Sequence, residues 1–380
     1  MKEKCRILYG LEAADGGALT HLTYLVCNLN KKLFRITVII SDKRSFRVHK
    51  EIEKMERCGV KVIVLGMTRS IHPVKDLISF FKILKHIRTG KYDIIHAHSS
   101  KAGVLFRMAG WLNRVNCIVY TPHCFYFQCE RGIRKLFFLC VEKMMSILTD
   151  HIVVSHNEKY EALKYLVAKS NKLIDINNAI PLNKCPPFEM NRVLRAQLNI
   201  ENDVVVVGAM GRLTRQKDWP TFIKAANETL KTVDNVVFLI IGEGEELLAI
   251  KRLIQELRLE KKVIVTGYRN DIGKLYNLID IYINTSLWEG LPYVLVEAMG
   301  YRKPIIATNL NYGAIIEDEK NGYLVNRKDY KIMANRIISL INNSALRKTM
   351  GKNGLYLSKK HLSFRRFILK HQDLYLSSRF

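Results

Sequence analysis

Short runs of β-branched and other apolar residues alternate with helical patterns along the whole chain. This alternation is typical of parallel β-sheets whose strands are joined by crossover helices. Seven strands are predicted first, at residues 5–11, 35–41, 60–66, 92–98, 117–123, 151–155 and 172–179. Six more follow, at residues 203–211, 236–244, 262–268, 281–286, 303–308 and 321–326. The pattern therefore predicts an α/β protein with two sheets.

A proline-rich stretch separates the two series of strands. It contains Pro181, Pro186 and Pro187, and such a cluster is typical of a domain boundary. A chain of 380 residues has room for two domains, each with its own core. We therefore expect two α/β units that meet near these prolines.

Three segments between or after the strands have helical patterns. Residues 72–87 begin with a proline near the start and have apolar residues at helical spacing, which predicts a crossover helix. Residues 135–148 form another helix that is apolar on most sides, and we expect it in the core rather than as a membrane anchor. Residues 361–380 have the pattern of a basic amphipathic helix.

The chain has a formal net charge of +26, and residues 1–185 hold 31 Lys and Arg against 15 Asp and Glu, a net charge of +16. Such a field attracts either nucleic acid or an anionic membrane leaflet with phosphorylated substrates. Acidic residues alternate with the basic ones in residues 43–57, and no RNA-binding signature is present. We favour peripheral association with the anionic inner membrane and no nucleic-acid partner. Simple solubility stays open as an alternative.

Other features of the composition concern location and metals. No stretch approaches about 18 uninterrupted apolar residues, and residues 1–10 enter a strand without a signal-peptide core. These features predict a cytoplasmic protein. The eight cysteines are scattered, without the spacing of a zinc site or a disulfide framework.

Two glutamates, Glu289 and Glu297, stand eight positions apart where a predicted strand ends and a helix begins. Pro292 between them suits the first helical position, so Glu289 is expected in the loop and Glu297 in the helix. The free amides of a first helical turn bind phosphate groups. A helical rise over eight residues is about 12 Å, so the two carboxylates could bind hydroxyls on opposite sides of one diphosphate. The alternative is a solvated helix face.

Basic and glycine residues follow other predicted strands. Arg212 and Lys217 come after the first strand of the second half, where open sheets bind ligands, and both charges suit a diphosphate. Gly16 and Gly17 follow the first strand of the chain, where they let a ligand approach the backbone closely. His123 closes the predicted strand 117–123.

Together these segments resemble the large E-x7-E family of retaining glycosyltransferases, glycosyltransferase family 4, group 1. The segment HSSKAG at residues 98–103 resembles the subset that builds capsular polysaccharides and exopolysaccharides. The resemblance implies the GT-B fold, with two facing Rossmann-like domains. The first, at residues 1–183, would be the acceptor side, and the second, at residues 184–358, the nucleotide-sugar side. A C-terminal helix at residues 359–380 would cross back to pack on the first domain.

The resemblance also implies roles for individual residues. The catalytic residues would be His123, Glu289, Arg212 and Lys217. The donor-binding residues would be Gly16, Gly17, Arg212, Lys217, Tyr268, Arg269, Gly290, Leu291 and Glu297. Arg212 and Lys217 would stabilise the departing diphosphate, Glu297 would hold the ribose, and Glu289 would hold the transferred hexose. One departure from the family pattern is Tyr312 before Gly313, where a Gly-Gly pair is usual.

The function implied is transfer of a sugar, with retention, from a nucleotide-diphosphate donor, most simply a UDP-sugar. The acceptor would be a lipid-linked saccharide in capsule, exopolysaccharide or O-antigen synthesis. No Asp-x-Asp motif lies near a strand end, so neither a metal nor another cofactor is expected. A UDP-sugar 2-epimerase on the same fold is the alternative, and an RNA-binding protein is a third class.

Overall fold

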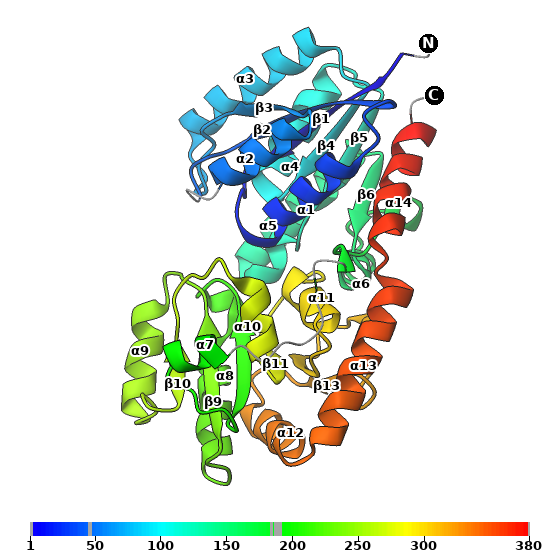
Figure 1. Cartoon of the computed structure of the whole chain (residues 1–380). Helices are drawn as coiled ribbons and strands as arrows, with labels where there is room; N and C mark the ends of the chain where they lie inside the picture. Colours follow the sequence, from blue (N-terminus) through cyan, green and yellow to red (C-terminus); the bar gives the residue numbers. More distant parts are fainter. Residues whose placement is uncertain (1–2, 45–47, 183–184, 186–191, 379–380) are drawn as a thin grey trace. The chain divides into compact units, whose positions relative to one another are not determined.

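The computed structural model of the chain describes residues 3–44, 48–182, 185 and 192–378, without the side chain of Ala314. Pro186 and Pro187, which mark the predicted boundary, lie outside the described residues. The chain forms two compact units (Figure 1). The first comprises Met1–Asn178 together with Arg365–Phe380, and the second comprises Ala179–Phe364.

The first unit is built on a seven-stranded sheet with the strand order β3-β2-β1-β4-β5-β6-β7, and every pair is parallel. The order of the strands reverses between β1 and β4, because the chain first builds outward to β3 and then crosses back. The strands are β1 Cys5–Leu11, β2 Phe34–Ile40, β3 Lys61–Val64, β4 Ile94–His98, β5 Cys117–Thr121, β6 His151–Val154 and β7 Leu173–Asp175.

Helices flank this sheet, with α1 against α2 and with α4 in contact with both α3 and α5. They are α1 Gly16–Asn28, α2 Val48–Arg57, α3 Pro73–Gly90, α4 Ser100–Leu112, α5 Gly132–Ile147, α6 His156–Lys164 and α14 Phe364–Ser377, with 3-10 turns η1 Tyr126–Cys129 and η2 Ser170–Lys172. The predicted crossover helix is α3, which has Pro73 at its first position. Ile83 and Ile87 of α3 enter the core of the unit with Phe106 of α4.

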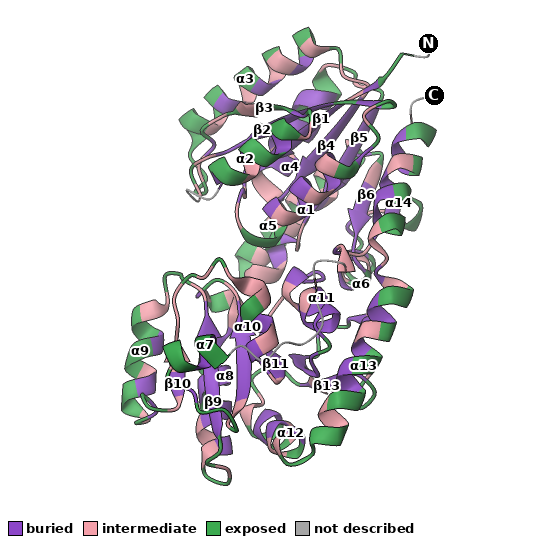
Figure 2. Cartoon of the chain, viewed as in Figure 1, coloured by how far each residue is buried: buried purple, intermediate pink, exposed green. Residues whose placement is uncertain are grey.

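The second unit is built on a six-stranded sheet with the order β10-β9-β8-β11-β12-β13, also parallel throughout. Here the strand order reverses between β8 and β11. The strands are β8 Val205–Met210, β9 Val236–Ile241, β10 Val263–Val265, β11 Ile281–Asn284, β12 Ile305–Thr308 and β13 Gly322–Val325. Figure 2 shows the strands of both sheets as largely buried.

The helices of the second unit bury apolar side chains against its sheet, with Trp219, Phe222 and Phe238 in one core cluster. They are α7 Arg192–Gln197, α8 Trp219–Leu230, α9 Leu247–Glu256, α10 Ile272–Leu278, α11 Tyr293–Gly300, α12 Tyr330–Asn342 and α13 Ser344–His361, with 3-10 turns η4 Arg215–Lys217 and η5 Gly313–Ile315. The predicted α/β fold class, with two parallel sheets, is confirmed.

The last helix, α14, belongs to the first unit, whereas residues 359–364 of the predicted final segment belong to the second unit. Its side chains Phe367, His371 and Tyr375 are buried. The Tyr375 hydroxyl lies 2.7 Å from Nδ1 of His96, at the centre of the first sheet. Residues from the two ends of the sequence therefore complete one core.

The prediction that residues 135–148 form a core helix is wrong. Only Glu142 and Ser146 of α5 are buried, whereas Ile133 is 84% exposed and Ile147 is 77% exposed. The physical reason is that α5 is in contact with α4 and η1 but has nothing over its outer side among the described residues. An apolar pattern on most faces of a helix does not tell which face the fold will cover.

Candidate active site

The predicted site residues follow strands at the carboxyl edge of each sheet. In open parallel sheets, ligands bind beyond the carboxyl ends of the strands, at the point where the strand order reverses. In the first unit that point is between β1 and β4, and in the second it is between β8 and β11. Each unit is described by itself below.

Gly16 and Gly17 are exposed and form the first two residues of α1, directly after β1. Gly16 has a φ of 54°, in the left-handed region that glycine adopts without strain. Asp15, at the N-cap position, makes no side-chain hydrogen bond to the first turn. The amides of this turn are thus not occupied by a capping side chain, and they can bind an anionic group.

His123 follows β5 in a strained turn, where it and Cys124 have φ values of 53° and 89°. Its Nε2 atom lies 3.0 Å from Nδ1 of His98, which ends β4. The pKa of His123 is well below its usual range, because the ring is desolvated and the imidazoles of His21 and His371 are near. The ring is therefore neutral at physiological pH, so one of its nitrogens donates a hydrogen bond and the other accepts one, and it cannot act as a cation.

The turn at His123 is held by a residue that the sequence prediction missed. Glu158 is buried, and its Oε1 atom accepts a hydrogen bond of 2.5 Å from the Cys124 amide. Its Oε2 atom accepts hydrogen bonds from the Ser155 backbone amide at 2.8 Å and from the Ser155 hydroxyl at 2.7 Å. The bond from the amide is part of a capping box formed by Ser155 and Glu158 at the start of α6. The Ser-x-x-Glu spacing was a visible signal for this contact.

Another missed residue lies beside the glycines. Glu12 is 2% exposed and follows β1, and it accepts two hydrogen bonds from the Arg44 guanidinium, at 2.9 and 2.8 Å. The double hydrogen bond satisfies both oxygens of this buried carboxylate and fixes the backbone just before α1. Nothing in the local sequence pattern signals a pair 32 residues apart.

Three histidines of the first unit could hold a metal ion by geometry alone. Donor atoms of His21, His98 and His123 all lie within 4.8 Å of one another. In this structure, however, the ring nitrogens of His98 and His123 are at hydrogen-bond distance from each other, and His21 Nδ1 is 2.8 Å from Oδ1 of Asn178. These rings fit a hydrogen-bonded cluster of neutral imidazoles.

In the second unit, the predicted residues Lys217 and Glu289 are in direct contact. Lys217 Nζ lies 2.5 Å from Oε1 of Glu289, and the Ser286 hydroxyl donates to the same oxygen at 3.0 Å. Glu289 is 8% exposed, so this pair is largely shielded from water. Arg212 is exposed two residues after β8, and the described residues give its side chain no ion pair.

Hydrogen bonds from side chains to backbone carbonyls join the loops that carry these residues. The Gln216 amide group donates to the Trp288 carbonyl at 2.9 Å, and the Thr285 hydroxyl donates to the Lys217 carbonyl at 2.5 Å. A neighbouring loop passes very close, because a Cβ at Gly242 would lie 1.9 Å from the carbonyl oxygen of Gly211. Lys217 and Glu289 are therefore positioned by a rigid edge of the sheet.

Glu297 lies within α11, as predicted, but Pro292 is the N-cap residue and the helix begins one position later, at Tyr293. Pro292 has a ψ of 134°, which is extended rather than helical. Glu297 is half-buried, and burial raises its pKa to about 7, against a smaller lowering by the Tyr276 hydroxyl 2.9 Å away. At neutral pH this carboxyl is close to its titration midpoint.

The other predicted donor residues take different positions. Gly290 and Leu291 are buried beside Glu289. Tyr268 and Arg269 follow β10, at the far end of the same sheet edge, and the Arg269 guanidinium forms a double hydrogen bond with Asp271 at 2.8 and 2.5 Å. The structure thus brings Lys217, Glu289 and the α11 N-terminus together, and it places the Tyr268–Arg269 loop two strands away.

Tyr312, the departure from the family pattern, is buried near Glu289. Its side chain is 1% exposed and its hydroxyl has no hydrogen-bond partner among the described residues. Its pKa is well above its usual range because of burial first and then the Glu289 charge. A tyrosine at this position fills volume and offers a hydroxyl beside the carboxylate predicted to hold the sugar.

Two family models match the chain, one over each half. The model described as Glycosyltransferase Family 4 matches residues 15–184, and the model described as Glycosyl transferases group 1 matches residues 190–355. Among relatives, the Escherichia coli UDP-Gal:alpha-D-GlcNAc-diphosphoundecaprenol alpha-1,3-galactosyltransferase is 30% identical over 317 residues, 82% of each chain. The capsular polysaccharide biosynthesis glycosyltransferase CapM of Staphylococcus aureus is 26% identical over 338 residues, 86% of this chain and 85% of CapM.

Solved structures share the fold. Anabaena HepE, in complex with UDP and glucose, matches with a TM-score of 0.83 at 20% identity over 98% of this chain and all of HepE. Sucrose-phosphate synthase from Thermosynechococcus elongatus matches with a TM-score of 0.78 at 19% identity, over 99% of both chains. The two sheets with their carboxyl-edge sites define a glycosyltransferase with the GT-B fold. The chain belongs to the group 1, family 4 glycosyltransferases, which favours sugar transfer over the epimerase alternative.

Among the described residues, no helix has the length and the apolar character needed to span a membrane.

Proposed function

We propose that this protein is a retaining glycosyltransferase that moves a sugar from a UDP-sugar to a lipid-linked saccharide in the synthesis of a surface polysaccharide. The observation that carries the proposal is the contact of Lys217 with Glu289 before the α11 N-terminus, where the second sheet reverses its strand order. The names of the relatives support the substrates, because the Escherichia coli enzyme is named for UDP-Gal and a diphosphoundecaprenol-linked sugar.

The positive groups of the second unit would stabilise the leaving diphosphate. The exposed Arg212 guanidinium can bind two phosphate oxygens at once, and the Lys217 ammonium adds a compact charge. The first-turn amides of α11 point the positive end of the helix dipole at the same region. Fixed charges of this kind can do the work of a bound cation, so we propose transfer without a metal ion.

The two glutamates would hold the hydroxyls of the donor. The Glu289 Oε1 atom accepts hydrogen bonds from Lys217 and Ser286, and a carboxylate accepts hydrogen bonds from the hydroxyls of a hexose in the same way. Glu297 would accept hydrogen bonds from the ribose hydroxyls in its ionised form. Tyr268 and Arg269 would border the base of the nucleotide.

The first unit would bind the acceptor and the reacting face of the sugar. The Gly16–Gly17 turn would approach the diphosphate, and the neutral His123 would donate a hydrogen bond to the transferred sugar. In the reaction, the bond from the anomeric carbon to UDP breaks and a bond to the acceptor oxygen forms on the same face. The acceptor proton passes to the departing β-phosphate oxygen, so no protein nucleophile is needed.

The acceptor lipid would be reached from the inner face of the cell membrane. Exposed apolar side chains along α5 include Leu136 and Phe137, at 61% and 58% exposure, and exposed Arg131 and Arg134 flank the start of the helix. A helix with apolar side chains between cations suits the interface of an anionic bilayer. This surface and the charge of +26 support peripheral membrane association.

The proposal is tested by measuring transfer from UDP-sugars to a lipid-linked acceptor with Lys217→Ala and Glu289→Gln. Each should reduce kcat/KM by about 100-fold or more, because a fixed charge contact to the transition state is lost. Lys224→Ala, an exposed lysine on α8, is the matched control. Near-normal rates in both site variants would refute the roles.

A second incubation separates transfer from epimerisation. The protein is mixed with a UDP-sugar and no acceptor, and the sugar is identified afterwards. An unchanged sugar, or slow hydrolysis, is expected of a transferase. Interconversion of the sugar at its 2-position would contradict the proposal.

A further inference from the structure

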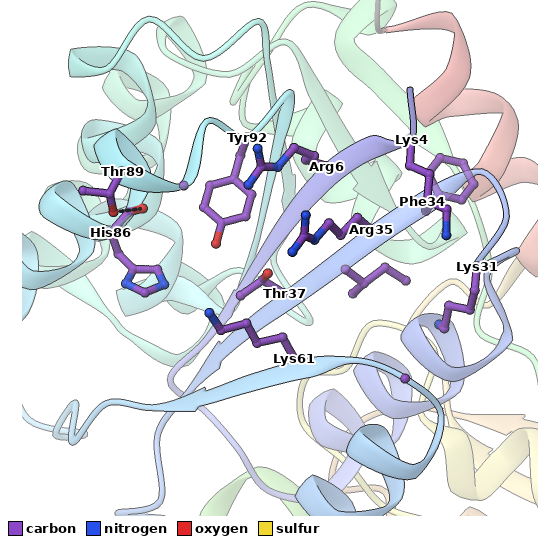
Figure 3. Close-up of a pocket in the computed structure, with 13 residues that line it drawn as sticks. Lys4, Arg6, Lys31, Phe34, Arg35, Thr37, Lys61, His86, Thr89 and Tyr92 are labelled. Carbon is purple, nitrogen blue, oxygen red and sulfur yellow. Dashed lines mark hydrogen bonds between the residues drawn. The ribbon is translucent and has the colours of Figure 1, made fainter. Parts of the chain in front are cut away.

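The first unit contains a basic hollow at the end of its sheet opposite to the candidate active site. The hollow has a volume of about 660 Å³ and is formed by the amino ends of β1, β2 and β3, the end of α3 and the residue Tyr92 (Figure 3). Volumes of this size are typical of small-ligand sites. The candidate active-site residues follow the carboxyl ends of the same strands, so the hollow is a separate place in the fold.

Positive groups dominate the lining of this hollow, which we call the basic hollow. Its basic side chains are Lys4, Arg6, Lys31, Arg35, Lys61 and His86. No Asp or Glu is among the described residues that line it. The carboxylate of Asp93 lies next to Arg6, but it accepts a hydrogen bond of 2.7 Å from the Arg6 backbone amide and does not line the hollow.

The sheet register places like charges side by side. Arg6 of β1 is paired directly with Arg35 of β2, and Lys61 of β3 is paired with Thr37, two residues after Arg35 on the same face of β2. Like charges opposite each other on neighbouring strands are destabilising. An anion held between them would remove this repulsion.

Three cations of the basic hollow lack a carboxylate partner among the described residues. Within the part of the chain that the structure describes, Arg6, Arg35 and Lys61 have no ion pair with a carboxylate. The Nε atom of Arg6 is buried and has no hydrogen-bond partner there. Two other half-buried cations of the unit do have carboxylate partners: Arg44 pairs with Glu12 and Lys101 pairs with Asp76. An anionic ligand could therefore pair with these cations and accept a hydrogen bond from Nε of Arg6.

Other groups complete the lining. The Tyr92 hydroxyl and the Thr37 side chain can donate hydrogen bonds to oxygen, whereas the Thr89 hydroxyl already donates to the Lys85 carbonyl at 3.1 Å. Close packing fixes the Tyr92 ring, because a Cβ at Gly90 would lie 2.1 Å from it. Cations arranged with hydroxyl donors suit tetrahedral phosphate oxygens, to which Arg can make two bonds at once.

We propose that the basic hollow binds a ligand that carries a phosphate or diphosphate group, at a site distinct from the donor site. The ligand is either a soluble phosphorylated molecule or the headgroup of an anionic lipid, and both present the same phosphate oxygens. The proposal does not depend on the proposed sugar transfer, since it concerns only the first unit.

The test is a calorimetric titration of the full-length protein with inorganic pyrophosphate at low salt. The variant Arg35→Ala/Lys61→Ala removes two exposed cations of the hollow and should bind pyrophosphate about tenfold more weakly or worse. Lys348→Ala/Lys352→Ala removes the same charge from exposed positions on α13 and should bind as the unmodified protein does. Equal binding by the hollow variant and the unmodified protein would overturn the proposal.

Lys217→Ala separates this site from the donor site. If pyrophosphate binding were lost in Lys217→Ala and kept in the hollow variant, the anion would bind only in the second unit. That result would overturn the basic hollow as a site and leave the proposed function standing. Retained binding in Lys217→Ala, together with loss in the hollow variant, supports the site whatever the reaction proves to be.

Two further readouts complete the experiment. Flotation with phosphatidylglycerol vesicles distinguishes the sources of phosphate: weaker flotation of the hollow variant identifies a lipid headgroup, and unchanged flotation with lost pyrophosphate binding identifies a soluble ligand. Arg35→Ala alone, without ligand at low salt, should melt at the same or a higher temperature than the unmodified protein, because it removes the repulsion with Arg6. A lower melting temperature would contradict the register argument.

Discussion

Replacement of Glu297 by glutamine should stabilise the protein at alkaline pH while it weakens donor binding. In the folded protein, burial raises the pKa of Glu297 from 4.5 to about 7. The folded state therefore holds the proton more tightly than the unfolded chain. Below about pH 4.5 both states are protonated and the carboxyl has no effect on stability. Between there and pH 7 the unfolded chain ionises first, so stability falls as pH rises.

The size of this effect follows from the two pKa values. The pKa rises from 4.5 to about 7, and each pH unit corresponds to about 1.4 kcal/mol. The free energy of unfolding is therefore lower by about 3 kcal/mol above pH 7 than below pH 4.5. Glutamine has nearly the same shape as glutamate and cannot ionise. At pH 8, Glu297→Gln should therefore recover most of the lost free energy of unfolding. For a unit of this size, the melting temperature should rise by roughly 5 to 10 °C. At pH 4.5 it should change little.

The assay is a melting curve at pH 4.5, 6 and 8 for the unmodified protein, Glu297→Gln and the control Glu260→Gln. Glu260 is exposed, so its variant should melt like the unmodified protein throughout. Added UDP should raise the melting temperature of Glu297→Gln less, because hydrogen bonds to a charged group each contribute about 1.5 to 3 kcal/mol. A lower melting temperature of Glu297→Gln at pH 8, or the same change at every pH, would refute the reasoning.

Three further predictions concern other parts of the fold. Arg44→Ala leaves the Glu12 carboxylate buried without its partner and should lower stability by about 3 to 5 kcal/mol, measured by denaturant unfolding; a change below about 1 kcal/mol would contradict it. Gly242→Ala puts a Cβ 1.9 Å from the Gly211 carbonyl oxygen and should lower both the melting temperature and UDP binding, and normal UDP binding would disprove the close approach. Phe137→Ser should weaken flotation with anionic vesicles without changing transfer to a water-soluble acceptor, and unchanged flotation would remove α5 from the membrane surface.

The sequence predicts most of the fold because the signal is local. Strands such as β8 and β9 are continuous apolar runs rich in valine, and each is buried on both faces, which is what such runs indicate. The sequence defines the ends of the strands less well. It predicts one strand over residues 117–123, but β5 ends at Thr121 and His123 lies in the turn. The position of α5 could not be predicted, since it depends on which neighbours cover the helix.

Only part of the candidate site comes from residues that are close together in the sequence. The Glu289–Glu297 spacing is visible in the sequence, and the structure puts the first in a loop and the second in α11. The contact of Lys217 with Glu289 joins residues 72 positions apart, and it depends on β8 lying next to β11 in the sheet. The family resemblance named both residues without placing them in contact. Their roles in binding and transfer stay predictions.

The course of α14 has a consequence for how the protein is made. The core around Tyr375 and His96 needs residues that leave the ribosome after all of Ala179–Phe364 has been synthesised. At about 5 to 20 residues per second, that interval lasts roughly 10 to 40 s. During this interval, the part of the first sheet that α14 later covers stays exposed to solvent. We therefore expect nascent chains of this enzyme to need chaperone protection that a sequentially continuous domain would not.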